Sequence, residues 1–161
     1  GDTPYQADKN AHEARKSGVQ IAFPRIYSCY SDDSQWNNND GNIRIMHIDI
    51  NRLSKLNSNM SPYQITSMIF RVYSQLVDTF IKKDSLTFYL GGDNFMVIAS
   101  NMLKVEVEKM LRMITEDTHI SLNCGIGKGR TGRDAAKTAT KALDIIRELR
   151  DKGTYVSVYE I

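Results

Sequence analysis

Two acidic residues stand where the chain could hold a metal ion. Asp49 lies near the end of the segment IRIMHIDI (Ile43–Ile50), and Asp93 lies in the tetrad Gly-Gly-Asp-Asn between two apolar segments. Two carboxylates that meet at one point repel each other unless a divalent cation lies between them, and such hard oxygen ligands suit Mg²⁺. A magnesium ion held in this way keeps positions for water and for phosphate oxygens, as in sites that polymerise or cyclise nucleotides. We therefore take Asp49, Ile50 and Asp93 as metal ligands, and Asp49, Asp93 and Asn94 as catalytic residues.

The residues around these carboxylates indicate how a nucleotide could bind. Gly91 and Gly92 have no side chains to keep a nucleotide away from the backbone. The segment after Ile50 begins with Asn51 and could offer backbone N–H groups to phosphates. Taken alone, Gly-Gly-Asp-Asn is also an ordinary hairpin turn, and an Asp at a strand end is a common turn initiator. The two acidic residues together, on strands expected to be neighbours, favour a site.

Three basic residues are further candidates for phosphate contact. Lys128 and Arg130 belong to the glycine-spaced segment GIGKGRTG, which is interpreted as a turn, and Lys137 lies in the helical segment that follows. The structural alternatives are a solvated surface turn for the first two and a solvated helix face for Lys137. The segment does not have the spacing of a Walker-type phosphate-binding loop.

His47 and the cysteines allow structural explanations as well. His47 lies on the same strand face as Asp49 by the period of two, so it could reach a metal or a base, although a packed strand histidine is the favoured explanation. Cys29 and Cys124 are too few for a disulfide scaffold and lack zinc-ligand spacing. We expect reduced thiols, with Cys124 in the core.

The elements that must position these residues follow from hydrophobic periodicity and turn signals. The expected order is β-α-β-β-α-β followed by α-β, which is a split ferredoxin-like arrangement of the α+β class, an antiparallel sheet with helices on one face. In this topology the first strand lies beside the central hairpin, so Asp49 comes close to Asp93. The expected elements are strand 43–50, helix 61–83, strands 86–90 and 95–99, helix 102–114, strand 119–126, helix 131–150 and strand 155–161.

The amino-terminal segment repeats part of the last helix. When residues 1–14 are set against 129–142, six of fourteen positions are identical, and each copy continues to a glycine and an extended apolar run. The repeat indicates a duplicated domain, of which only the end of the first copy is present here. Between the copies, SCYSDDSQWNNNDG is too polar to fold alone. We therefore divide the chain into a remnant of a first palm domain (1–27), a polar linker (28–41) and a second palm domain (42–161).

Composition excludes several classes of protein. The chain has 161 residues, 41% hydrophobic and 25% charged, with a formal net charge of +2. These values are ordinary for a globular domain and too balanced for broad nucleic-acid binding. No apolar run is long enough to span a membrane, and the first residues do not resemble a signal peptide. The expected protein is cytoplasmic.

Four segments together resemble archaeal GTP cyclohydrolase III: HIDINRLS, LTFYLGGDNFMVIAS, CGIGKGRTGRDAAKTATKAL and GDTPYQADKNA. The strand, helix and Gly-Gly-Asp hairpin also resemble the palm domains of diguanylate cyclases and class III adenylyl cyclases. The resemblance covers the whole chain except the linker, and it implies two tandem palm domains. It further implies Mg²⁺-dependent hydrolysis of GTP to a formylamino-pyrimidine ribonucleoside monophosphate with release of two phosphates. The expected partners are GTP, the missing first palm lobe and further copies in a homo-oligomer.

Two other functions stay open. One is a nucleotidyl cyclase or polymerase-like palm, and the other is a nucleotide-binding lobe without catalysis. Asn94 stands where diguanylate cyclases have a glutamate, and an amide cannot take a proton from a ribose hydroxyl. This residue therefore argues against attack by the 3′-hydroxyl group and against cyclisation.

Overall fold

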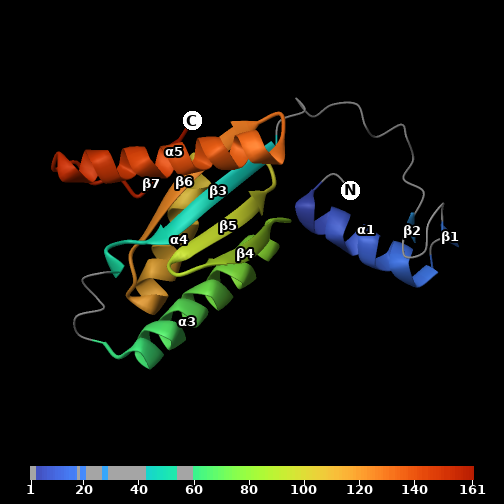
Figure 1. The fold of residues 1–161 in the computed structure, drawn as a ribbon, viewed down its shortest axis with the longest axis horizontal. Helices are drawn as coiled ribbons and strands as arrows, with labels where there is room; N and C mark the ends of the chain where they lie inside the picture. The colour runs from blue at the N-terminus through green and yellow to red at the C-terminus, as the bar shows by residue number, and fades with distance from the viewer. Residues whose placement is uncertain (1–2, 18, 21–26, 29–42, 54–59) are drawn as a thin grey trace.

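The structure is a computed structural model that describes residues 3–17, 19–20, 27–28, 43–53 and 60–161. Its main feature is a five-stranded sheet in the order β4-β5-β3-β6-β7 (Figure 1). The elements of this palm domain are β3 (Ile43–Ile50), α3 (Pro62–Ile81), β4 (Leu86–Gly91), β5 (Asn94–Ala99), α4 (Lys104–Thr118), β6 (Leu122–Gly129), α5 (Gly132–Asp151) and β7 (Val158–Glu160).

Strand pairing follows the expected α+β palm topology. The central strand β3 is antiparallel to both β5 and β6, and β4 pairs with β5 in an antiparallel hairpin. The last strand, β7, adds to the sheet parallel to β6. The predicted βαββαβ order, extended by one helix and one strand, is thus confirmed.

The helices are divided between the two faces of the sheet. The helices of the βαββαβ unit, α3 and α4, contribute Val72, Leu76 and Val107 to the main core with the β3 residues Met46 and Ile48. The alternate β3 residue Ile45 packs instead with Ala135 and Ala139 of α5. The prediction that the helices lie on one face of the sheet therefore holds for α3 and α4 but is wrong for α5, which covers the opposite face (Figure 1).

α5 approaches β6 unusually closely, because the strand presents glycines to it. A Cβ atom added at Gly125 would lie 2.1 Å from the Ala139 carbonyl oxygen, and one at Gly127 would lie 2.2 Å from the Ala139 nitrogen. The expectation of a glycine-spaced turn after Ile126 is therefore wrong. These residues continue β6 to Gly129, and their glycines make room for the backbone of α5.

α3 begins with a complete capping box. The Ser61 side chain accepts a hydrogen bond from the Gln64 backbone N–H (3.3 Å), and the Gln64 side chain accepts one from the Ser61 N–H (2.8 Å). We expect the substitution Ser61→Ala to lower the free energy of unfolding by about 1 kcal/mol, because it leaves an N-terminal N–H without its acceptor. Denaturant unfolding measures this loss. The exposed Ser67→Ala within α3 is the control, and an equal loss there would contradict the capping role.

The boundary between α4 and β6 differs from the expected one. α4 runs to Thr118, and His119 closes it in a left-handed conformation with φ 60°. Helical periodicity ended earlier in the sequence because the last turn, 115–118, contains polar residues. β6 consequently begins at Leu122 rather than at residue 119.

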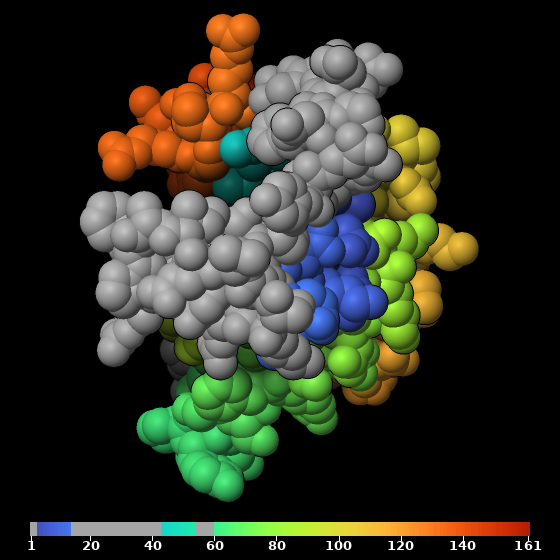
Figure 2. Space-filling model, turned by 90° about the vertical axis from the view of Figure 1, so that its right-hand side faces the viewer, coloured from blue at the N-terminus to red at the C-terminus, as the bar shows by residue number. Residues whose placement is uncertain are grey.

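The amino-terminal segment forms α1 (Pro4–Ser17) and a small antiparallel pair, β1 (Val19–Gln20) with β2 (Tyr27–Ser28). Thr3 Oγ1 accepts the Gln6 N–H before α1, and Thr131 Oγ1 accepts the Asp134 N–H before α5. These caps occupy equivalent positions in the repeat, which supports the duplication. Figure 2 shows α1, in blue, beside the surface near β4, where the Tyr5 N–H donates to the Asp84 carbonyl oxygen (3.2 Å).

The proposed domain boundaries stay a prediction. Apart from Ser28 at the end of β2, the linker 28–41 lies outside the described residues, as does Cys29. Among the described residues, no helix is both long and apolar enough to cross a membrane.

Candidate active site

Strand register brings the two acidic residues of the predicted site to the same end of the sheet. Asp49 of β3 pairs with Asn94, the first residue of β5, and Asp93 immediately precedes Asn94 in the β4–β5 turn. The Ile50 N–H donates to the Asp93 backbone carbonyl oxygen (3.2 Å), which ties the turn to β3. Gly91 and Gly92 shape this turn with φ of 109° and 60°, values that favour glycine. The structure thus brings together Asp49, Ile50, Gly91, Gly92, Asp93 and Asn94.

The Asp49 carboxylate is buried and fully engaged. Its residue exposure is 4%. Oδ1 accepts a hydrogen bond from Asn123 Nδ2 (2.8 Å), and Oδ2 forms an ion pair with Arg147 Nη2 (2.8 Å). A buried carboxylate needs such a partner, because an uncompensated charge in the protein interior is costly.

Arg147 supplies the positive charge at this end of the sheet. Its other terminal nitrogen, Nη1, pairs with Asp144 at 2.8 Å, and its side chain is 43% exposed. Burial by itself would lower the pKa of the Arg147 guanidinium, but the hydrogen bonds and charges of Asp49 and Asp144 outweigh that effect and raise this pKa. The guanidinium therefore stays charged, with one edge against Asp49 and part of its surface open to solvent.

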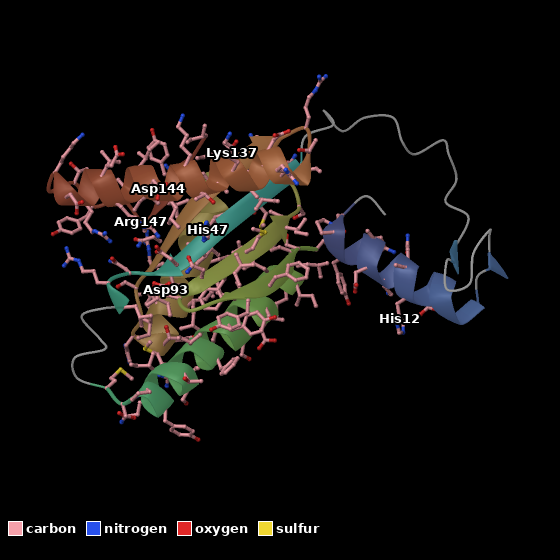
Figure 3. All side chains as sticks on the ribbon, in the orientation of Figure 1. His12, His47, Asp93, Lys137, Asp144 and Arg147 are labelled. Atoms are coloured by element: carbon pink, nitrogen blue, oxygen red, sulfur yellow. The ribbon has the colours of Figure 1, made fainter. Side chains whose placement is uncertain are left out.

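Asp93 is held by a second group of polar side chains. Asn94 Nδ2 donates to Asp93 Oδ1 (2.8 Å), and Asn94 Oδ1 lies 3.0 Å from His47 Nε2. The other ring nitrogen of His47 lies 3.0 Å from Thr140 Oγ1 of α5. Figure 3 shows His47 and Arg147 between α5 and this end of the sheet, and Asp93 just below the end of β3 in this view. His47 is therefore neither simply packed in the core nor free to approach a ligand.

Asn51, two residues after Asp49, lies at the edge of a cavity of about 240 Å³. Its Oδ1 accepts a hydrogen bond from Arg150 Nη1 (2.9 Å). The cavity lies between the end of α5 and the start of β6, and its lining includes the polar residues Asn51, Ser121, Asn123, Arg150, Tyr155 and Ser157. The rest of the lining is apolar (Leu122, Ile146 and Val156), and the guanidinium among the polar side chains could bind an oxyanion.

The three predicted basic contacts lie elsewhere. Lys128 pairs in register with Arg44 and forms an ion pair with Glu160 (3.2 Å). Arg44 lies five residues before Asp49 on β3, a distance of about 16 Å along the strand. Arg130 lies two residues after Lys128, in the direction that leads away from the site. Lys137 is exposed on α5, ten residues before Arg147, which corresponds to about 15 Å along the helix (Figure 3). In the described structure these residues do not join the site that Asp49 and Asp93 form.

Sequence reasoning missed Arg147, Asn123 and Arg150. The pairing of Asn123 with Asp49 depends on β3–β6 register, and the arginines reach the site only because α5 crosses the glycine face of β6. The spacing of Arg147 and Arg150, three apart on one helix face, was the available signal. Cys124, by contrast, is buried as expected, and burial raises the pKa of its thiol.

The oxygen donors at this end of the sheet are of the type that Mg²⁺ prefers. The described residues contain no cluster of three or more His, Cys, Asp or Glu side chains that could enclose a metal. Mg²⁺ is, however, commonly held by one or two carboxylates together with water and phosphate oxygens. Asp49, Asp93 and the Ile50 carbonyl offer oxygens of the required type, and the ion pair with Arg147 is the interaction that a cation at Asp49 would have to replace.

Similar solved structures identify the class of fold. The active GGEEF domain of a diguanylate cyclase from Vibrio cholerae superposes with a TM-score of 0.57 at 15% identity, covering 73% of this chain and 83% of that one. A bacterial light-regulated adenylyl cyclase gives 0.53 at 14% identity, covering 73% of this chain and 42% of that one. The chain thus has the palm fold of nucleotide cyclases.

Sequence relatives narrow this class to one family. A family model described as GTP cyclohydrolase III matches residues 1–160. A curated GTP cyclohydrolase III from Methanobrevibacter smithii is 32% identical over 99% of this chain and 63% of its own length. Another from Methanocaldococcus jannaschii is 31% identical over 94% of this chain and 57% of its own length. The chain belongs to the GTP cyclohydrolase III family and spans about 60% of the length of these relatives.

Proposed function

We propose that this chain carries the magnesium and nucleotide site of a GTP cyclohydrolase. The reaction opens the guanine imidazole ring of GTP, gives a formylamino-pyrimidine ribonucleoside monophosphate and releases two phosphates. The observation that carries the proposal is the convergence of Asp49 and Asp93 at adjacent strand ends, in a chain that matches the family over residues 1–160. The curated relatives carry the name of this activity.

The geometry supports separate tasks for the residues of the site. Asp49, Ile50 and Asp93 would hold Mg²⁺, which when bound neutralises phosphate charge and polarises the phosphoanhydride. Arg147 pairs with Asp49, and Arg150 is hydrogen-bonded to Asn51, two residues after Asp49; we assign both arginines to the phosphate oxygens. Asn51 joins them through its hydrogen bond with Arg150.

The position of Asn94 favours hydrolysis over cyclisation. Its amide nitrogen donates to Asp93 and its oxygen faces His47, so both ends of the side chain already have partners. An amide also has no basic lone pair with which to deprotonate a ribose hydroxyl. This supports a reaction in which water, rather than the 3′-hydroxyl group, is the nucleophile.

The product formed from GTP tests the proposal. Incubation of the protein with GTP and Mg²⁺, followed by chromatography and mass measurement, should give a formylamino-pyrimidine nucleotide together with phosphate. A cyclic nucleotide with pyrophosphate would contradict the proposal and support a cyclase.

The curated relatives are longer than this chain, and we propose that a first palm lobe accompanies the one described here. Ala7 and Ala11 of α1 are exposed, whereas the equivalent Ala135 and Ala139 of α5 are fully buried against β6. In a palm lobe this helix face would be covered by a sheet. The alternative of a nucleotide-binding lobe without catalysis predicts that the 161-residue chain binds Mg²⁺–GTP without turnover. Measurable turnover by this chain would exclude that alternative.

A further inference from the structure

His47 lies at the centre of a hydrogen-bonded chain that leads from α5 to the β4–β5 turn. It belongs to β3, two residues before Asp49 and on the same face of the sheet. Both ring nitrogens have a partner at 3.0 Å: Nδ1 faces Thr140 Oγ1, and Nε2 faces Asn94 Oδ1. Three elements, α5, β3 and β5, thus hold one imidazole ring between them.

The direction of this chain follows from the amide of Asn94. Its nitrogen donates to Asp93 Oδ1 (2.8 Å), so its oxygen is the atom that faces His47. A carbonyl oxygen only accepts hydrogen bonds, and His47 Nε2 must therefore carry a hydrogen. Donation runs in one direction, from His47 Nε2–H to Asn94 Oδ1 and from Asn94 Nδ2–H to Asp93 Oδ1.

This assignment excludes His47 as a base at Nε2, because that nitrogen already donates to Asn94. Nδ1 is turned toward Thr140 under α5, away from the β4–β5 turn. Thr140 Oγ1 also lies 3.1 Å from the Ala136 carbonyl oxygen, and its single hydrogen can be donated to that oxygen or to His47 Nδ1 but not to both. Both ring nitrogens are therefore engaged, although the residue itself is only partly buried.

We propose that His47 is a positioning residue for Asp93, acting through Asn94. The inference rests on the proposed function, since Asp93 matters to catalysis only as a ligand of the metal and nucleotide. Asp93 lies in a tight turn and is only partly buried, so packing alone does not select one orientation of its carboxylate. The donor from Asn94 engages Oδ1 and leaves Oδ2 for the cation, and His47 in turn prevents the Asn94 amide from rotating. Outer-shell partners of this kind change metal affinity or activity by roughly 10–100-fold when removed.

Two substitutions separate positioning from packing. His47→Gln keeps an amide N–H that can reach Asn94 Oδ1, whereas His47→Leu fills the space without a donor. We expect His47→Leu to weaken Mn²⁺ binding in the presence of GTP by roughly tenfold or more, measured by electron paramagnetic resonance. His47→Gln should stay within about threefold of the unsubstituted chain. His12→Gln, an exposed histidine on α1, is the control and should change nothing.

Several outcomes would overturn the proposal. One is a folded His47→Leu chain that binds Mn²⁺ with unchanged affinity, and another is a His47→Gln chain as impaired as His47→Leu. If His47→Leu does not fold, nitrogen-15 NMR of the unsubstituted chain provides the test: we expect a His47 ring protonated at Nε2, and a ring protonated only at Nδ1 would refute the chain of donors. The loss of Mn²⁺ binding in His47→Leu is compared with the loss in Asp93→Asn. Unchanged binding in Asp93→Asn would refute the proposed function itself, whereas unchanged binding in His47→Leu alone would refute only the positioning role of His47.

Discussion

Asp93→Asn should abolish Mg²⁺-dependent turnover of GTP, with a loss of at least about 10²-fold in rate, a typical cost of removing a key electrostatic group. The substitution replaces a charged oxygen ligand by an amide, which binds magnesium poorly. It keeps the shape of the side chain, and the Asn94 amide can still donate to the remaining carbonyl oxygen. The measurement is the rate of product formation from GTP, together with Mn²⁺ affinity in the presence of GTP.

Asp93 is a cleaner position for this test than Asp49. Asp49 is buried and paired with Arg147 at 2.8 Å. Its replacement would remove one of the two carboxylate partners of the partly buried Arg147 guanidinium and would therefore lower the stability of the fold as well. Asp117→Asn, on the exposed side of α4, is the matched control. Retained activity in an Asp93→Asn protein that melts normally would mean that the site lies elsewhere.

Gly127→Ala should be strongly destabilising, lowering the free energy of unfolding by about 3 kcal/mol or more, at or above the upper end of ordinary overpacking. The new Cβ atom would lie 2.2 Å from the Ala139 nitrogen and 2.4 Å from the Ala135 carbonyl oxygen. Both are backbone atoms of α5, so no side chain can rotate away and the helix itself must move. Thermal unfolding should show a drop in Tm of roughly 10 °C or more.

Gly132→Ala is the matched control, since a Cβ atom there meets nothing within 4 Å and alanine favours the first turn of α5. The Gly127→Ala protein should also bind Mn²⁺–GTP more weakly, because a displaced α5 carries Arg147 and Thr140 away from Asp49 and His47. A Gly127→Ala protein with the same Tm as Gly132→Ala would show that α5 is not held against β6 as described.

Local patterns were sufficient for most of the palm domain. Alternation along IRIMHIDI predicted β3, Ser61-Pro62 marked the start of α3, and the Gly-Gly-Asp-Asn tetrad marked the β4–β5 hairpin. These features depend on neighbours in the chain, such as a cap, a turn or the period of a strand. Together with topology they also placed Asp49 beside the turn that contains Asp93.

The glycines of β6 show where local patterns fail. In GIGKGRTG the glycines indicate a turn when considered alone, and Lys128 and Arg130 then look like phosphate ligands. In the structure the first three of these glycines, Gly125, Gly127 and Gly129, lie within a strand, because α5 packs its backbone against them. Lys128 therefore lies at the end of the sheet opposite to Asp49, where it forms an ion pair with Glu160.

The residue types and short-range spacing were thus enough to predict the order of the elements, the two acidic residues and the family of the chain. Only the packing of α5 decided which cation faces Asp49, because contacts between Arg147 and a strand about 100 residues earlier depend on helix placement rather than on sequence spacing. The same packing placed Thr140 against His47 and so joined a strand histidine to Asp93. Side chains distant in sequence meet where two close-packed surfaces fit, and that fit is a property of the whole core.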